Sequence, residues 1–566
     1  MADGYRRSPA TAAHSLWTRL LIPSMGDTIF VAMLAVLTCT SLSVRLLGDA
    51  GIGWHIRTGQ QILAAHAVPR VDSFSSVMRG KTWFAWEWLY DVIVGGLERR
   101  AGLNGVVWFT AVVIASVFTW TFRLLLRRGT NVFVALALLL LAASASMIHF
   151  LARPHVLSWL FTLAWFWILD SSESDCLRAD SAGLSATHSA ATGRRRLWFL
   201  PLLMLAWVNV HGGFLVGFVL VAIYWLSAVW YAVRVKEDKF DQFLVKLRAE
   251  AHARSLAAVG LAAGVASLVN PYRWKLHAHI YGYLSNRFLM EHIDEFQSPN
   301  FHGVAQRCFA LLVLAAMVAL ASRARALRVS EGLVILFAIY SGLYASRNIP
   351  VSSLLLALVI GPLLSGAIKD LAGRLTPLRR LGASVGAFAE RMGAVESSMQ
   401  GHLWAIAAAV FLGAIAAHGG RLGVDRLMDA HFDGKRFPAA AVDFLDRKTA
   451  GERTADESAA VTVPDYWGGY LIYRLYPRTL VAVDDRHDLY GEAFFKSYLR
   501  MVHVEPGWDA LLEKYQSRCV LVPKGSALAN ILQQTPPWKR VYADDVAVIF
   551  ERNRERNPEQ NGERNQ

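Results

Sequence analysis

The sequence predicts a polytopic α-helical membrane protein with about 11 transmembrane helices, followed by a C-terminal α/β domain outside the cytoplasm. Of the 566 residues, 54% are apolar, and the mean hydropathy is +0.32. The apolar residues form long runs separated by short basic loops, a pattern that soluble domains of this length do not sustain. After residue 420 these runs end, and short strand and helix patterns replace them.

The formal net charge of +14 has two explanations, nucleic-acid binding and membrane orientation. The basic residues lie in short loops beside apolar runs, so the positive-inside rule accounts for them and no nucleic-acid partner is expected. The four cysteines are widely separated, which argues against a disulfide framework and against a structural zinc site.

Basic residues also set the topology. Arg6, Arg7 and Arg19 precede the first predicted span, residues 28–47, and place the N-terminal segment 1–27 in the cytoplasm. Residues 83–97 are apolar but short, and we expect an interfacial or re-entrant helix there, with a full span as the alternative. If this helix does not cross, nearly all later basic clusters fall inside. The further predicted spans are residues 105–125, 131–151, 155–169, 197–210, 214–233, 256–269, 304–321, 329–344, 349–368 and 403–417.

This topology divides the chain into the N-terminal segment 1–27, a membrane domain, an outer domain and a tail. Residues 28–420 form the membrane domain, whose first outer loop covers residues 48–103, and residues 421–551 form the outer α/β domain. The tail 552–566 and the inner loop 171–196, which is rich in Ser, Ala and Thr, are expected to be disordered.

The first outer loop concentrates the candidate chemistry. It presents Asp49, His55, Asp72 and Glu87 in order, with tryptophans around Glu87. A carboxylate at the mouth of a membrane helix is tolerated when water or a cation solvates it. The alternative is an acidic loop that only joins two spans.

Other polar residues at span ends share this predicted outer face. They are Arg153, His155, His211 and Arg347. Each one alone is explained by a helix cap or a turn. Collected on one face, they suggest the lining of an outward-facing polar cavity.

Five motifs carry a resemblance to a known family. They read GDAGIGWHIRTG at 48–59, DSFS at 72–75, WEWL at 86–89, PDYWGG at 464–469 and VDDRHDLYG at 483–491. An acid after the first span, an interfacial helix, a second acid and an aromatic-rich helix resemble the first outer loop of the GT-C superfamily. This superfamily contains polytopic glycosyltransferases that use polyprenyl-phosphate-linked sugars, among them protein O-mannosyltransferases, aminoarabinose transferases and oligosaccharyltransferases. The motifs most resemble a poorly characterised bacterial branch.

The resemblance implies a glycosyltransferase of the bacterial inner membrane, with a periplasmic C-terminal domain. The donor would be a polyprenyl-phosphate sugar among membrane lipids, and the acceptor a glycan, a lipid or a protein. By position in the family, Asp49 would be the general base, assisted by Asp72 or Glu87. Residues expected to neutralise the donor phosphate are His55, Arg153, His155, His211 and Arg347.

Two questions stay open at this stage. A divalent cation, magnesium or manganese, is a candidate cofactor, with Asp49 and Asp72 as candidate ligands. The chain also departs from the family, because Asp49 is followed by Ala50 instead of a second acid, and no W-W-D-Y-G motif is present. A lipid-linked glycan carrier or flippase, and a non-catalytic glycan-assembly subunit, are the alternative functions.

Overall fold

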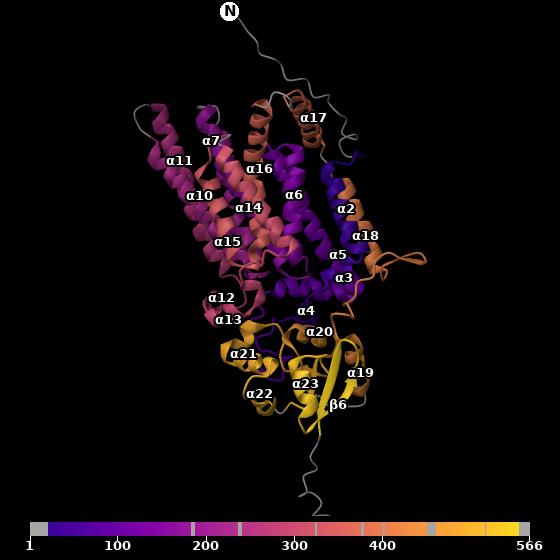
Figure 1. The fold of residues 1–566 in the computed structure, drawn as a ribbon. Coiled ribbons are helices and arrows are strands. Elements are labelled where there is room, and N and C mark those ends of the chain that lie inside the picture. Colours follow the sequence, from indigo (N-terminus) through magenta and orange to yellow (C-terminus); the bar gives the residue numbers. More distant parts are fainter. Residues whose placement is uncertain are drawn as a thin grey trace, which may run out of the picture.

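The computed structural model describes residues 21–182, 187–235, 240–322, 325–374, 379–399, 402–449, 460–515 and 517–553. A bundle of helices stands on a smaller α/β domain, drawn in yellow in Figure 1. We call the end of the bundle that contacts this domain the domain side. Most of the predicted N-terminal segment 1–27 and of the tail 552–566 lies outside the described residues.

Every predicted span coincides with a helix. The bundle helices are α2 (Met25–Cys39), α3 (Leu42–Leu46), α5 (Trp88–Arg127), α6 (Val132–Ser146), α7 (His155–Ala182), α8 (Thr187–Leu197), α9 (Phe199–Trp207), α10 (Leu215–Arg234), α11 (Phe240–Ser267), α14 (Val304–Ser322), α15 (Val329–Tyr344), α16 (Ile349–Arg374), α17 (Arg379–Ser398) and α18 (Leu403–Ala417). Within the described residues, 5 helical segments are long and apolar enough to cross a membrane, and three shorter apolar helices accompany them. The count of about 11 spans stays a prediction.

Two local features differ from a simple reading of hydropathy. Helix α5 breaks at Gly102, whose φ of 59° and ψ of −158° are not helical, so the predicted interfacial segment and the following span form one interrupted helix. The disorder predicted for the loop 171–196 is wrong for its described residues, because α7 continues to Ala182 and α8 begins at Thr187. Packing of α7 against α8 overrides the polar composition, and Arg196 contacts Asp175 at 3.4 Å between them.

The α/β domain is built on a five-stranded sheet. The sheet has the order β4-β3-β5-β7-β6, with β3 parallel to β4 and β5 and the other pairs antiparallel. Its strands are β3 (Ala460–Thr462), β4 (Leu480–Val481), β5 (Cys519–Pro523), β6 (Trp538–Ala543) and β7 (Ala547–Arg552). Its helices are α19 (Ala439–Thr449), α20 (Asp465–Leu475), α21 (His487–His503), α22 (Ala510–Lys514) and α23 (Ala527–Gln534). A short hairpin, β1 (Arg421–Leu422) and β2 (Asp425–Arg426), links the domain to α18.

The first loop is part of this domain's structure. Ser75 pairs in parallel with Val481 at the edge of the sheet, and the Ser76 amide donates to the Val481 carbonyl at 2.8 Å. Helix α4 (Ile52–Ala65) packs on α20 so closely that a Cβ on Gly53 would lie 2.1 Å from the Gly469 carbonyl oxygen. The glycines of the 48–59 and 464–469 motifs therefore permit contact between two backbones.

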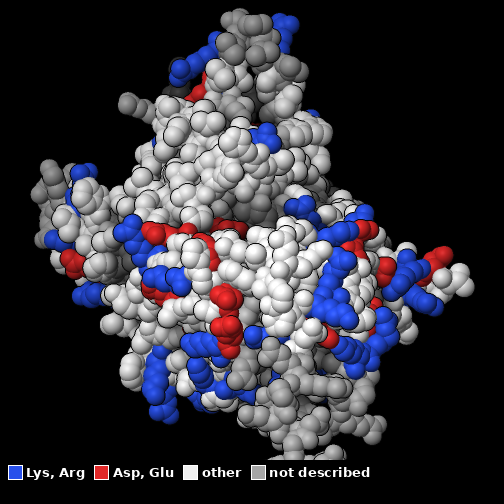
Figure 2. Space-filling model, turned by 60° about the horizontal axis from the view of Figure 1, so that its bottom comes forward, with Lys and Arg blue, Asp and Glu red and all other residues white. Residues whose placement is uncertain are grey.

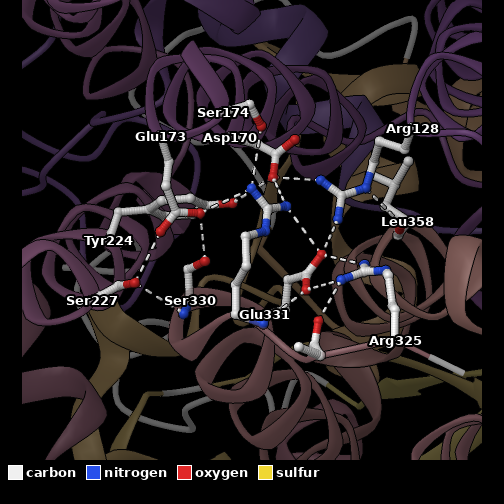
Figure 3. Close-up of polar contacts among 12 residues, drawn as sticks. Arg128, Asp170, Glu173, Ser174, Tyr224, Ser227, Arg325, Ser330, Glu331 and Leu358 are labelled. Carbon is white, nitrogen blue, oxygen red and sulfur yellow. Dashed lines mark hydrogen bonds and ion pairs between the residues drawn. The ribbon is translucent and has the colours of Figure 1, made fainter. Parts of the chain in front are cut away.

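A cluster of ionised side chains lies at the opposite end of the bundle and joins α5, α7 and α15 (Figure 3). Glu331 accepts from Arg128 at 2.8 Å and from Arg325 at 2.7 Å. Arg328 donates to Asp170 at 2.7 Å and contacts Glu173 at 3.0 Å. Glu331 is 1% exposed, so its charge depends on these arginines.

The substitution Glu331→Gln should therefore destabilise the bundle by about 3 kcal/mol, because it removes the buried carboxylate that Arg128, Arg325 and Arg328 share. Glu390→Gln is the matched control, since Glu390 is 74% exposed and contacts only Lys369, at 3.6 Å, among the ion pairs of the described residues. Thermal unfolding of both variants in detergent measures the difference. Equal midpoints would show that the cluster does not hold these helices.

Candidate active site

Asp49 contacts an arginine from a distant part of the chain. It follows α3, and its Oδ1 accepts from the Gly51 amide at 2.7 Å, a turn that leads into α4. Arg153, in the turn before α7, donates from Nη1 to the same Oδ1 at 3.1 Å. The same Nη1 donates to Asp485 Oδ2 of the α/β domain at 2.7 Å, and Trp54 holds Asp485 Oδ1 at 2.9 Å. We call Asp49, Arg153 and Asp485 the Arg153 junction.

The Arg153 junction occupies the space that a side chain at position 51 would need. A Cβ on Gly51 would lie 1.5 Å from Arg153 Nη1 and 2.4 Å from Asp485 Oδ2. The backbone of Gly51, with φ −58° and ψ −25°, suits any residue, so space alone requires glycine here. Burial lowers the pKa of Arg153, but the charges of Asp49 and Asp485 outweigh it and hold this pKa above its usual value. The guanidinium is therefore permanently charged.

Asp72 belongs to a different ion pair. Its Oδ1 contacts Arg486 at 2.7 Å, its Oδ2 accepts from the Ser75 amide at 2.9 Å, and the residue is 1% exposed. Arg486 also donates to Asp484 at 2.6 Å, and its guanidinium lies over the Trp83 ring at 4.6 Å. Asp72 thus joins the first loop to the domain, and it is sealed from solvent.

Glu87 lies between two imidazoles. Its Oε2 is 3.8 Å from His55 Nε2, and its Oε1 is 3.8 Å from His211 Nε2. His55 is fully buried, stacks on Trp54 and contacts Asp91 Oδ1 through Nδ1 at 2.5 Å. His55 is therefore a buried partner of Asp91, and its Nε2 lies toward Glu87.

The second imidazole has a defined orientation. His211 Nδ1 accepts from the Gly213 amide at 3.0 Å and contacts Ser158 Oγ at 2.8 Å. An amide can only donate, so Nδ1 carries no proton and the neutral ring carries its proton on Nε2, toward Glu87. His155 donates from Nε2 to the His149 carbonyl at 2.8 Å, and its ring lies 6.5 Å from that of His211.

Burial dominates the electrostatics of Glu87. It raises the pKa of Glu87 to about 8, while Arg153 and Arg347 lower this pKa and Asp488 and Glu295 raise it. The carboxyl group is therefore mainly protonated at neutral pH, and it can donate a hydrogen bond.

Arg347 contacts a loop that precedes α14. It contacts Glu295 at 3.1 Å, and its guanidinium lies 4.3 Å from the centre of the Phe296 ring. Burial raises the pKa of Glu295, but the charges of Arg347, His149 and Arg153 outweigh it and lower this pKa. The eight predicted site residues thus lie at the domain side, with Asp72 and His55 buried away from solvent.

Four further residues complete the site, and sequence reasoning did not assign them a role. They are Asp91, Glu295, Asp485 and Asp488. Asp91 is four residues after Glu87 on one helix, a spacing that signals a shared face. Asp485 and Asp488 belong to the 483–491 motif, and Asp488 contacts His279 of α12 (Trp274–Leu284) at 2.9 Å.

An open groove of about 670 Å³ adjoins the site. Trp88 lies beside Glu87 in the chain and donates to Asn209 at 2.7 Å, and both residues line the groove. Arg273 lines it with a φ of 53°, which is uncommon for a residue other than glycine. The lining residues are Trp88, Asn209, Leu268, Val269, Asn270, Pro271, Arg273 and Trp274.

Comparison with solved structures identifies the fold. No family model matches the sequence, and no curated protein matches it. The oligosaccharyltransferase AglB from Archaeoglobus fulgidus, in complex with an inhibitory peptide and a dolichol-phosphate, is similar over 90% of this chain and 70% of its own, with a TM-score of 0.54 and 13% identity. The chain has the GT-C fold. ArnT from Cupriavidus metallidurans, bound to undecaprenyl phosphate, matches over 93% of this chain and 98% of its own, with a TM-score of 0.45 and 16% identity.

Basic and acidic side chains are interspersed over the face that carries the domain (Figure 2). A surface that binds nucleic-acid backbones concentrates positive charge instead.

Gly51→Ala should disrupt the junction, because the new methyl group overlaps Arg153 Nη1. We expect a loss of about 2 kcal/mol in unfolding free energy, the scale for forcing an extra methyl group into a packed site. Gly96→Ala is the control, since its Cβ would meet only Leu63 Cδ1 at 3.7 Å, an ordinary contact. Chemical unfolding of the two variants measures this, and equal stability would contradict the packing described.

Proposed function

We propose that the chain is a glycosyltransferase that moves a sugar from a polyprenyl-phosphate-linked donor to an acceptor on the outer face of the bacterial inner membrane. The observation that carries the proposal is the Arg153 junction beside an apolar groove, at the end of a GT-C membrane bundle. The domain side would then be the periplasmic side. The dolichol-phosphate named for the similar archaeal oligosaccharyltransferase supports a lipid phosphate as the donor's carrier.

Asp49 is the general base in this proposal. Oδ1 is held by the Gly51 amide and Arg153, while no described residue donates a hydrogen bond to Oδ2. The side chain is 32% exposed, so an acceptor hydroxyl can reach Oδ2. The acceptor oxygen attacks the anomeric carbon, its proton passes to Oδ2, and the bond from that carbon to the phosphate oxygen breaks. The lipid phosphate leaves with the electron pair.

The phosphate would be bound by permanently charged hydrogen-bond donors and by neutral ones. Arg153 uses Nη1 for the two carboxylates, and within the described residues its Nη2 and Nε make no hydrogen bond. A guanidinium in this state can donate to a phosphate oxygen. The protonated Glu87 carboxyl group and the Nε2–H of His211 would add neutral donors, and Arg347 would add a second charge at the rim.

The groove would hold the lipid chain. Leu268, Val269 and Trp274 give the groove an apolar wall. Trp88, which follows Glu87 in the chain, also lines the groove. Trp274 is 64% exposed and Val269 61%, which suits contact with lipid. An isoprenoid chain in the groove would bring its phosphate toward the Arg153 junction.

Asp49→Asn should lower sugar transfer about 100-fold, because the amide keeps the shape but does not accept the proton. Asp545→Asn is the matched control: the same change at a side chain that is fully exposed and contacts Lys524 at the domain surface. The assay follows release of undecaprenyl phosphate from pentose- and hexose-linked donors by purified protein in nanodiscs.

Full transfer activity in Asp49→Asn would refute its role as base. If the wild-type protein binds these donors and transfers no sugar to any acceptor in a membrane extract, the glycan-binding subunit becomes the better account. Movement of the intact donor across a vesicle bilayer, with no transfer, would identify a carrier.

The proposed orientation predicts opposite locations for two reporters. A reporter fused after Ser185 should be cytoplasmic, and one fused after Ser526 should be periplasmic, because the basic loops fall on one side. Alkaline phosphatase and green fluorescent protein fusions at both sites measure this. The same location for both fusions would overturn the topology.

A further inference from the structure

A shared divalent cation does not suit the acids that the sequence suggested for it. Asp72 is paired with Arg486 and two backbone amides, and Asp49 is paired with Arg153. The two carboxylates therefore belong to separate ion pairs. Within the described residues, no group of three or more His, Cys, Asp and Glu side chains is arranged to hold a metal ion.

A different pair of acids does converge, and an arginine lies between them. Asp49 Oδ1 and Asp485 Oδ2 contact the same nitrogen, Arg153 Nη1, at 3.1 and 2.7 Å. Trp54 orients Asp485 from the other side. Carboxylate oxygens that converge on one point are the usual ligands of Mg²⁺ or Mn²⁺, which would draw them to about 2.1 Å. Here the guanidinium nitrogen takes that central position.

Several features make this arrangement specific to an arginine. Gly51 leaves the space that Nη1 fills, and any side chain there would overlap it. The Arg153 side chain is 22% exposed, so part of the guanidinium is available to a ligand. A guanidinium does not lose its proton near neutral pH, and it is tethered to the chain, so a chelator cannot remove it.

We propose that Arg153 is the resident cation of this site, and that its side chain keeps Asp49 and Asp485 from binding a divalent metal. The chain would then bind the donor phosphate, and transfer the sugar, without a metal ion. The part about transfer rests on the proposed function, whereas the part about metal binding does not.

The test is direct binding of Mn²⁺, followed by electron paramagnetic resonance on purified protein in detergent. Wild-type protein should show no site at the Arg153 junction. Arg153→Ala should gain one Mn²⁺ site with a dissociation constant of about 10⁻⁴ M or tighter, because the two converging carboxylates lose the cation that they share. Adding Asp485→Asn to that variant should abolish the site.

Two controls keep the test decisive. Arg153→Lys preserves a charge at this position and should bind no Mn²⁺, and Arg347→Ala removes a neighbouring charge and should bind none either. A folded Arg153→Ala protein without a Mn²⁺ site would overturn the proposal. So would a wild-type site that disappears in Asp485→Asn, and this second result is available even if Arg153→Ala does not fold.

The activity arm separates the two proposals. Once a donor that supports transfer is found, treatment with EDTA should change the wild-type rate by less than about 2-fold, because the site holds no metal ion to remove. A large loss that Mg²⁺ or Mn²⁺ restores would overturn the inference and leave the glycosyltransferase proposal standing. Absence of transfer with every donor would count against the proposed function, while the Mn²⁺ result would still decide the role of Arg153.

Discussion

The contact of one guanidinium with two carboxylates holds three distant parts of the chain together. Asp49 comes from the first loop, Arg153 from the turn before α7, and Asp485 from the α/β domain. A buried charge is stable only while its partners remain in place. The position of α4, the docking of the domain and the orientation of Asp49 Oδ2 therefore all depend on this contact. The close packing of Gly53 and Gly469 helps to keep these parts in register.

The different exposure of two arginines, Arg486 and Arg153, indicates which acid can react. Arg486 is fully enclosed and neutralises Asp72 and Asp484, whereas Arg153 remains partly open to solvent. Asp72 thus stabilises the contact between the loop and the domain, and Asp49 is the acid that an acceptor can reach. The parallel pairing of Ser75 with Val481 extends the sheet into the first loop, which makes the two parts one folded unit. The site lies at their common boundary with the bundle.

Features that depend on local sequence were predictable. Apolar runs located most of the bundle helices, and the short strand and helix patterns after residue 420 indicated the α/β domain, because both follow from the periodicity of single elements. The positions of the basic loops also predicted that the candidate acids lie at one end of the bundle. The partners of those acids were not predictable, since Arg153 and Asp485 are 332 positions apart and a single sequence does not reveal their contact. The contact of His55 with Asp91 was not predictable either, because only the packing of α4 on α5 brings the two side chains together.

If the Arg153 junction binds a lipid phosphate, a structure of the protein with such a lipid will show the phosphate there. Electron cryo-microscopy of the protein in nanodiscs with undecaprenyl phosphate would locate both ends of the lipid. The account predicts the phosphate within about 3 Å of Arg153 nitrogen atoms, the range of a charge-assisted hydrogen bond, and the isoprenoid chain in the groove beside Trp88. Phosphate density at the opposite end of the bundle, near Arg128 and Glu331, with an unchanged Arg153 junction, would contradict it.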